Sequence, residues 1–291
     1  MYKFTRGYQK MVQDIYPHKL HNEFDPNVQA TQEDVLLCIV NGRILIHLNC
    51  FENKEVVFPK VKEIQIHSEY RYLFSIDSTK YFLCDMQLEE NQIPSGYGYV
   101  EERSLRIEGI GSKDNLFAAI TGKHLADWYR DTKFCGRCGH KMVHSTKERA
   151  MVCPECHNTV YPRIMPAVIV GVINGDKLLL TKYRTGFKYN ALIAGFTEIG
   201  ETVEETVKRE VMEEAGIKVN NIRYYKSQPW GSANDILLGF FCNVKGNDEI
   251  NMDTNELKYA DWVQRDEIIL QPGEFSLTNE MMKLFKENKV E

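Results

Sequence analysis

Two pairs of cysteines constrain the fold of this 291-residue chain more than any other feature. Cys135 and Cys138 form one CxxC pair, Cys153 and Cys156 form a second, and fourteen residues separate the pairs. Each pair can make a tight turn whose thiolates point at one ion, and two such turns complete a tetrahedron of sulfur ligands. The pattern predicts a closed, structural zinc ribbon.

Two other interpretations of this segment stay open. A redox dithiol needs one CxxC pair at a helix start, whereas both pairs here lie in hairpin sequence that contains glycine and proline. A nucleic-acid-binding module is the second, and it has modest support from basic side chains. These are Lys133, Arg137, Lys141 and Lys147. The remaining cysteines stand alone and are expected to pack in cores. They are Cys38, Cys50, Cys84 and Cys242.

Composition and charge narrow the function. A hydrophobic fraction of 43% and a charged fraction of 26% are ordinary for globular proteins, and the length fits two or three domains. The formal net charge of -5 gives no attraction for polyphosphates or nucleic acids, so phosphate chemistry has to recruit metal cations. Since no apolar run has the length of a signal peptide or a bilayer span, we expect a cytoplasmic protein with no membrane partner.

Hairpin and helix signals organise the chain. Asn41-Gly42 between the apolar runs 35–40 and 43–48 predicts a hairpin. Further elements are expected as strands at 70–76 and 81–86, a helix over 116–130, and a hairpin of 167–173 with 177–183. The predicted domains are a β-rich N-terminal domain at 1–130, a zinc ribbon at 131–162 and a third domain at 163–291.

An acidic helix follows the second hairpin. Thr202 and Glu205 form a capping-box pattern and Gly216 is placed to end the helix, so we expect it to span about 203–215. Valines recur every fourth residue and define the buried stripe. They are Val203, Val207 and Val211.

Some of the glutamates in this helix are predicted to face inward. At about 100° per residue, Glu210 and Glu214 project on the side of the valine stripe, Glu213 lies at its edge, and Glu204 points to water. Two inward carboxylates four residues apart repel each other and are costly to desolvate. Divalent cations with a preference for oxygen ligands, Mg²⁺ or Mn²⁺, would remove that cost. Arg209 is placed to pair with Glu201 and hold the preceding loop.

These residues resemble a known signature. Gly195, five residues, Glu201, seven residues and then Arg209 to Ile217 match the Nudix box, GX5EX7REUXEEXGU, at every fixed position. The resemblance implies an α+β chain whose C-terminal domain is an α/β/α sandwich around a mixed sheet. It also implies that Glu210 and Glu214 are the main metal ligands, Glu213 a further ligand or base, and Glu201 a supporting catalytic residue.

The zinc ribbon just before the box resembles the NADH pyrophosphatase subfamily. Ser227-Gln228-Pro229-Trp230 matches the first half of the subfamily motif SQPWPFPxS, whereas residues 231–235 depart from it, which leaves nucleotide selectivity open. The resemblance implies further metal ligands at the Ala194 carbonyl and Glu256. It implies substrate contacts at Arg106, Glu148, Tyr161, Phe196, Gln228, Pro229, Trp230 and Ser276.

The resemblance therefore implies an enzyme that hydrolyses NAD(H) to nicotinamide mononucleotide and AMP with Mg²⁺ or Mn²⁺. Removal of an NAD cap from RNA is the same bond cleavage on a larger substrate, and the resemblance keeps it as an extension of this activity. One alternative keeps the mechanism and changes the substrate to ADP-ribose or another dinucleotide. Another is a nucleotide-sensing or nucleic-acid-binding Nudix protein without turnover. The subfamily also implies a homodimer.

Overall fold

The computed structural model describes residues 11–49, 52, 55–64, 70–105, 111–186, 188–273 and 275–290, and it divides into two compact units. Of the described residues, the N-terminal unit comprises those in 12–163 and 231–234, and the C-terminal unit comprises Met11 and those in 164–230 and 235–290. The finer division of the chain at residues 130 and 162 stays a prediction.

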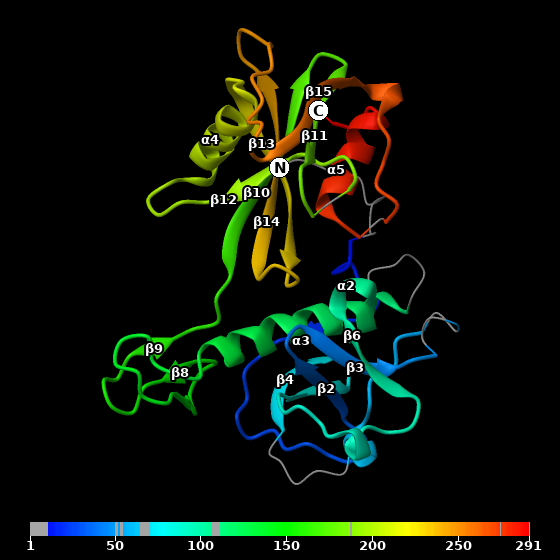
Figure 1. The fold of residues 1–291 in the computed structure, drawn as a ribbon, viewed down its shortest axis with the longest axis vertical. Helices are drawn as coiled ribbons and strands as arrows, with labels where there is room; N and C mark the ends of the chain where they lie inside the picture. Colours follow the sequence, from blue (N-terminus) through cyan, green and yellow to red (C-terminus); the bar gives the residue numbers. More distant parts are fainter. Residues whose placement is uncertain are drawn as a thin grey trace. The chain divides into compact units, whose positions relative to one another are not determined.

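A six-stranded sheet forms the body of the N-terminal unit (Figure 1). Its order is β1-β4-β5-β2-β3-β6, and β2 and β5 run parallel while the other neighbours are antiparallel. The strands are β1 (Leu20–His21), β2 (Val35–Val40), β3 (Arg43–His47), β4 (Arg71–Ile76), β5 (Thr79–Cys84) and β6 (Tyr97–Glu101). The predicted hairpin is confirmed, since Asn41 and Gly42 both take positive φ between β2 and β3.

Helices and short 3-10 turns complete this unit. They are η1 (Val61–Glu63), η2 (Glu90–Gln92), α2 (Glu102–Leu105) and α3 (Lys113–Asp131). The long α3 confirms the predicted helix and packs against β2, β4 and β5, where Gly122 lets the helix approach Leu37 closely. Cys38 and Cys84 are buried in the core as predicted, while Cys50 lies outside the described residues.

The cysteine-rich segment forms a small antiparallel sheet in the same unit. It has three strands in the order β7-β8-β9. They are β7 (Val143–His144), β8 (Met151–Val152) and β9 (Thr159–Val160). Each CxxC pair lies in a tight backbone turn beside this sheet. In the first turn the Gly139 N–H donates to the Cys135 carbonyl at 2.8 Å, and in the second the His157 N–H donates to the Cys153 carbonyl at 3.0 Å.

A mixed sheet forms the centre of the C-terminal unit. Its order is β13-β14-β10-β11-β15, with β12 paired to β10. Among the described strands of this sheet, β10 and β14 pair in parallel and the other neighbours are antiparallel. The strands are β10 (Met165–Asn174), β11 (Lys177–Tyr183), β12 (Ile193–Phe196), β13 (Val219–Trp230), β14 (Asp235–Val244) and β15 (Leu257–Gln264). The second predicted hairpin, now β10 and β11, is confirmed.

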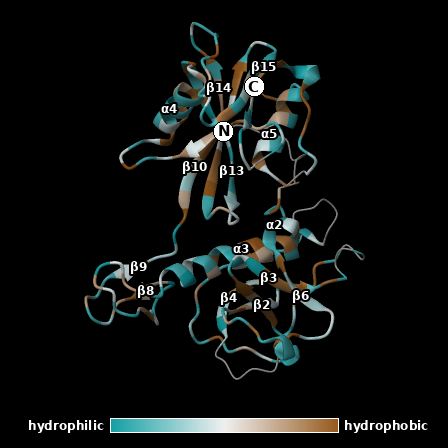
Figure 2. Ribbon diagram, in the orientation of Figure 1, coloured by the Kyte–Doolittle hydropathy of each residue, from teal (hydrophilic) through white to brown (hydrophobic). Residues whose placement is uncertain are grey.

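One helix covers each face of that sheet, α4 (Val203–Ala215) on one side and α5 (Leu277–Lys286), which follows η3 (Arg265–Glu267), on the other (Figure 1). Alternate residues of β10 explain this layering. Val168 and Val170 pack in the core under α4, whereas Ile169 packs in the core under α5. Hydrophobic residues follow the strands of both units in Figure 2. The predicted α+β class, with an α/β/α sandwich around a mixed sheet, is confirmed.

In the described part of the chain, none of the helices combines the length and the apolar character that crossing a bilayer requires.

Candidate metal and catalytic sites

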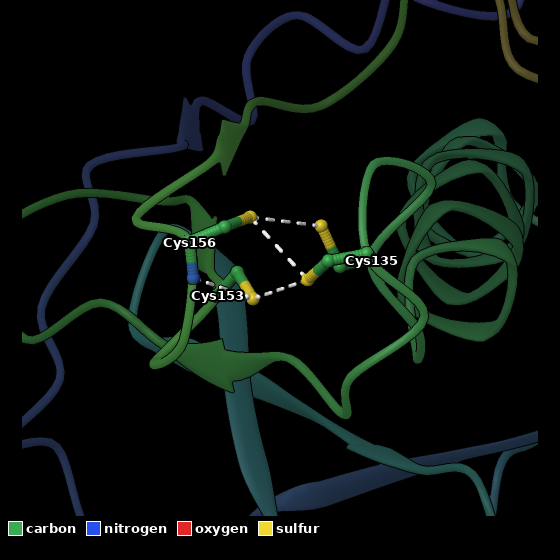
Figure 3. A group of neighbouring side chains, drawn as sticks. Cys135, Cys153 and Cys156 are labelled. Carbon is green, nitrogen blue, oxygen red and sulfur yellow. Dashed lines mark hydrogen bonds between the residues drawn. The ribbon is translucent and has the colours of Figure 1, made fainter.

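The four predicted zinc ligands converge. Their sulfur atoms all lie within 4.8 Å of one another. Cys138 Sγ is 3.4 Å from both Cys153 Sγ and Cys156 Sγ, and Cys135 Sγ is 3.6 Å from Cys156 Sγ. Figure 3 shows the labelled Cys135, Cys153 and Cys156 side chains pointing toward a common centre. Four thiol sulfurs so gathered fit a tetrahedral zinc site with every position taken by protein.

Backbone amides stabilise the thiolates of this cluster. The Arg137 N–H points at Cys135 Sγ over 3.4 Å and, as the largest influence, lowers the pKa of that thiol to about 6. The Cys156 N–H does the same for Cys153 over 3.5 Å and lowers its pKa. Because the metal binds thiolate rather than thiol, these bonds prepare the ligands for zinc. The chain thus carries a structural zinc ribbon.

The acidic helix α4 begins and ends where the sequence predicts. Thr202 Oγ1 accepts from the Glu205 N–H, and the Glu205 carboxylate accepts in return from the Thr202 N–H at 2.8 Å. At the other end Gly216 takes the left-handed conformation with φ of 69°. These caps fix the two ends of the helix, and the buried Val207 and Val211 set which of its faces lies against the sheet.

Arg209 connects three glutamates of the box. Its Nε donates to Glu201 Oε1 at 2.6 Å and its Nη2 donates to Glu201 Oε2 at 2.9 Å. Its Nη1 donates to Glu210 at 2.7 Å and to Glu213 at 2.9 Å. This guanidinium holds the pKa of Glu201 at about 2. The predicted pairing of Arg209 with Glu201 is confirmed.

Glu214 is the most buried carboxylate of the helix. It is 3% exposed, and its Oε2 has no hydrogen-bond partner among the described residues. Burial, followed by the charges of Glu210 and Glu256, raises its pKa to about 8. The pKa of Glu210 is also raised, chiefly by burial. The side chains therefore follow the predicted division, with Glu210 and Glu214 inward and Glu213 at an exposed edge.

A glycine leaves the space that Glu210 occupies. A Cβ built on Gly195 in β12 would lie 1.9 Å from the Glu210 carboxyl group. Beside it, the Ala194 backbone hydrogen bond lowers the pKa of Glu214, against the larger effect of burial. Strand β12 therefore brings its backbone directly against both inward carboxylates, and this is where the sequence places the Ala194 carbonyl ligand.

Glu256 approaches this group from the chain just before β15. Its charge acts on both Glu210 and Glu214, although its own side chain is exposed. In the described residues, the cysteines alone form a group of three or more ligand atoms within 4.8 Å. The carboxylates of Glu210, Glu214 and Glu256 thus share one region, although their oxygens do not all lie within 4.8 Å of one another.

Two side chains near the carboxylates escaped the sequence reasoning. Tyr183, at the end of β11, is half-buried, and its pKa is raised first by burial and then by the charges of Glu214 and Glu256. Asp253 adds a further negative charge to Glu214. Tyr183 ends an apolar strand and Asp253 sits in a polar loop, so neither stands in a motif that would have marked it.

The predicted substrate contacts are scattered. In the N-terminal unit, the Tyr161 hydroxyl donates to Glu148 Oε1 at 2.9 Å, so these two residues form a pair. Arg106 lies outside the described residues. In the C-terminal unit, Phe196 is half exposed next to Gly195, which leaves its ring open to a stacking partner.

The other predicted contacts lie on β13 and at the start of α5. Gln228 is fully buried, its amide nitrogen donates to Phe275 O, and its oxygen accepts from the Leu277 N–H, both at 2.8 Å. Ser276 caps α5 by accepting from the Asn279 N–H. Pro229 is exposed and Trp230 is half-buried. Gln228 therefore positions the loop before α5, and its role as a substrate contact stays a prediction.

Two family models match the chain. The model of the NUDIX domain matches residues 163–285, and the model of the NADH pyrophosphatase zinc ribbon domain matches residues 130–161. Together with the relatives described next, these matches define the chain as a member of the Nudix family that carries the zinc ribbon of NADH pyrophosphatases.

Curated relatives agree with that membership. The "NAD-capped RNA hydrolase NudC" of Photorhabdus laumondii is 41% identical over 60% of this chain and 68% of its own length. The protein of the same name from Klebsiella pneumoniae strain 342 is 45% identical over 52% of this chain and 59% of its own length. A solved NUDIX hydrolase from Nitrosomonas europaea is 24% identical over 54% of this chain and 92% of that chain, with a TM-score of 0.48.

Proposed function

We propose that this protein hydrolyses the diphosphate linkage of NAD(H) to nicotinamide mononucleotide and AMP. One observation carries the proposal: Glu214 is a buried carboxylate with an unpartnered oxygen, beside the charges of Glu210 and Glu256. Such an arrangement is costly unless a cation balances it. The names of the relatives and the intact box support diphosphate chemistry at this place.

The residues present fit a divalent cation. The donors are carboxylate oxygens, which hard ions such as Mg²⁺ and Mn²⁺ prefer, and Gly195 lets the Glu210 carboxylate lie directly against the backbone of β12. We assign Glu210, Glu214 and Glu256 as the ligands, with Glu213 and the Ala194 carbonyl as further donors. When bound, the ions supply Lewis-acid stabilisation of phosphate charge and lower the pKa of the attacking water.

Side chains of the protein orient the metal ligands and accept a proton from the attacking water. Arg209 fixes the Glu210 carboxylate, and its ion pair with Glu201 anchors the loop that leads into α4. We assign proton acceptance to Glu213, whose side chain is exposed. Water oxygen forms the new bond to one phosphorus, its proton passes to Glu213, and the bond from that phosphorus to the bridging oxygen breaks, which gives the two mononucleotides.

A local excess of positive charge supports NAD-capped RNA as a larger substrate. Basic side chains line a cavity of about 350 Å³ around Tyr183, the residue that also lies against the inward glutamates. They are Lys182, Arg184, Lys188 and Lys258. The net charge of -5 therefore does not describe this face, since binding of a phosphate backbone depends on the local field. We assign the cavity to the nucleotides that follow the cap.

The departure from the subfamily motif keeps ADP-ribose as a second candidate. Residues 231–234 group with the N-terminal unit, where Ser232 Oγ donates to Glu102 Oε2 at 3.0 Å. Residues 231–234 therefore present a different surface to a bound nucleotide than the two prolines of the subfamily motif would. Selectivity for the nicotinamide half is the property that this change would alter.

Product analysis separates these candidates. NADH, NAD⁺, ADP-ribose and NAD-capped RNA are incubated with the protein and Mg²⁺ or Mn²⁺, and the products are resolved by liquid chromatography with mass detection. We expect AMP and nicotinamide mononucleotide, faster than the products of ADP-ribose, and no turnover by a Glu214→Gln variant. Absence of turnover on the whole panel by the native protein would favour nucleotide sensing.

Two further parts of the proposal concern assembly and location. We propose a homodimer, which the resemblance implies, and a cytoplasmic location, which the sequence analysis favours. Light scattering coupled to gel filtration measures the first, since a dimer doubles the 33.8 kDa mass of the chain. Fractionation of the source cells measures the second.

A further inference from the structure

A cavity of about 540 Å³ lies in the N-terminal unit, and the proposed hydrolysis makes no use of it. Its wall comes mainly from four separate parts of the chain: residues 24–32, residues 70–72, Tyr129 of α3, and residues 144–150. The volume lies in the range of about 300–1,000 Å³ that is usual for small-molecule sites. The side chains in the wall decide which ligand it fits.

Arg71 places a positive charge in this wall without an acidic partner. Its Nη2 donates to His144 Nε2 at 2.6 Å, and its guanidinium carbon lies 4.3 Å from the centre of the Tyr129 ring. Within the described ranges no carboxylate lies within 4 Å of this guanidinium. Because an imidazole and an aromatic face hold the group in place, its charge is left for an anion from outside the protein.

His144 presents a donor in the same wall. Its Nε2 accepts from Arg71, so the neutral ring carries its hydrogen on Nδ1. Burial, followed by the charge of Arg71, lowers the pKa of His144 to about 4, which keeps the ring neutral at pH 7. The Nδ1–H makes no hydrogen bond to any described residue, and it adds a donor next to the guanidinium.

A second arginine lies behind the wall. Arg149 Nη2 donates to the Leu73 carbonyl at 2.7 Å, and the guanidinium lies over the ring of Phe24, which lines the cavity. Its Nη1 is buried and has no acceptor among the described residues. Burial lowers the pKa of Arg149. The desolvated guanidinium of Arg149 has no carboxylate partner in the described ranges, which raises the energy of the empty cavity, and a bound anion near Arg71 and Arg149 would offset that cost.

Aromatic rings make up much of the remaining wall. Tyr72 packs edge-on against Phe82 at 5.5 Å, whereas Tyr70 has no ring partner in the part of the chain that the structure describes. The negative side chain in the wall, Asp25, accepts from the Asn27 N–H at 2.9 Å within its own turn. Aromatic faces beside arginines are the surfaces on which nucleic-acid bases stack while phosphates bind.

We propose that this cavity binds a nucleoside phosphate, with the phosphate at Arg71 and His144 and the base against the tyrosines. The ligand is either a free nucleotide or a nucleotide within an RNA strand, because both present the same two groups. The site lies in the N-terminal unit and does not depend on the proposed hydrolysis.

Hydrogen–deuterium exchange on the full-length, zinc-loaded protein tests the proposal without relying on turnover. Exchange is measured with AMP, with a 5′-phosphorylated pentaadenylate, with adenosine and with inorganic phosphate, in the absence of Mg²⁺ and Mn²⁺. We expect AMP, the pentaadenylate or both to protect residues 24–32, 70–72 and 144–150, and adenosine and phosphate to protect them less. Protection by the pentaadenylate alone identifies an RNA strand as the source.

Variants of the wall supply the contrast. Arg71→Ala is expected to raise the ligand concentration needed for half-maximal protection about tenfold. Tyr70→Ala is the second variant and is used if Arg71→Ala does not fold. Arg103→Ala removes an exposed arginine of α2 and serves as the matched control. The proposal is wrong if neither AMP nor the pentaadenylate protects these residues, if phosphate alone protects as well as AMP, or if both wall variants keep full protection.

Discussion

The Arg209 guanidinium donates two parallel hydrogen bonds to the Glu201 carboxylate, from Nε to Oε1 at 2.6 Å and from Nη2 to Oε2 at 2.9 Å. Its third nitrogen, Nη1, donates to Glu210. The loop before α4 is thereby fastened to the helix that carries the proposed metal ligands. A planar fork of donors is needed for this geometry, and lysine cannot supply it.

Replacing Arg209 with lysine is therefore expected to lower kcat about 10–100-fold, the usual cost of losing a group that orients metal ligands. The reason is that Glu201 and Glu210 would share one point charge instead of a fork. Hydrolysis of NADH across a Mn²⁺ titration measures the effect. Lys208→Ala, which removes the neighbouring exposed cation, is the control. A lysine variant with native kcat and native metal dependence would contradict this role.

Gly195→Ala is expected to displace the Glu210 carboxyl group, since the added Cβ would lie 1.9 Å from it. Overpacking of this kind costs about 1–3 kcal/mol of stability, and a displaced ligand weakens metal binding about 10–100-fold. Calorimetric titration with Mn²⁺ measures the second effect. Gly273→Ala, whose Cβ would meet its nearest atom at an ordinary 3.7 Å, is the matched control. Equal Mn²⁺ affinity in both variants would count against a ligand role for Glu210.

Glu214→Gln separates stability from activity. Because burial raises the pKa of Glu214 to about 8, the folded protein must hold this carboxyl mostly protonated at pH 7, a cost that the neutral amide does not carry. The metal-free variant is therefore expected to be more stable than the native protein at pH 7 by about 1–3 kcal/mol. The same variant should lose turnover, since the carboxylate is a proposed metal ligand. Thermal unfolding without added divalent ions and NADH hydrolysis with Mn²⁺ measure the two effects. Exposed Glu204→Gln should change neither, and a fully active Glu214→Gln would remove Glu214 from the site.

Local signals made much of the C-terminal unit predictable. The caps Thr202 and Gly216 bound α4, and its 3.6-residue period already separated inward from outward glutamates. Local patterns carry no information on which distant strands meet that helix. Tyr183 and Gly195 reach the carboxylates only through the pairing of β10 with β11 and β12, so the sequence could not give their contacts with them.

The cavity at Arg71 shows the same limit more strongly. Arg71 and His144 are 73 residues apart and meet through a single hydrogen bond. From the sequence alone, His144 is interpreted as a surface histidine near the first CxxC pair, and Arg71 is interpreted as an isolated charge in a strand. They become part of one cavity wall only because the tertiary structure brings Arg71 at the start of β4 next to His144 at the end of β7.

Asp235 gives a pH-dependent prediction in the C-terminal unit. Burial raises the pKa of this 5%-exposed carboxyl from its ordinary value of 3.8 to about 6. Because the folded state favours the protonated form, the associated stability is present below about pH 4 and is lost as pH rises through about 6. Asp235→Asn should be more stable than the native protein at pH 7.5, by at most about 3 kcal/mol, and similar to it near pH 4. Thermal unfolding at both values measures this. Exposed Asp266→Asn is the control, and equal gains at both pH values would contradict the burial argument.

Zinc removal should reach beyond the ribbon. The metal closes the turns at Cys135 and Cys153, and the strand β7 between them supplies His144 to the cavity wall. Because structural zinc contributes folding free energy directly, a zinc chelator or Cys153→Ser should lower the melting temperature of the N-terminal unit and speed amide exchange at 143–152. Protection of residues 70–72 by AMP should disappear with it. The buried Cys242→Ser, outside the ribbon, controls for loss of a thiol. If Cys153→Ser kept native exchange rates throughout 143–152, zinc would not be what holds the ribbon strands together.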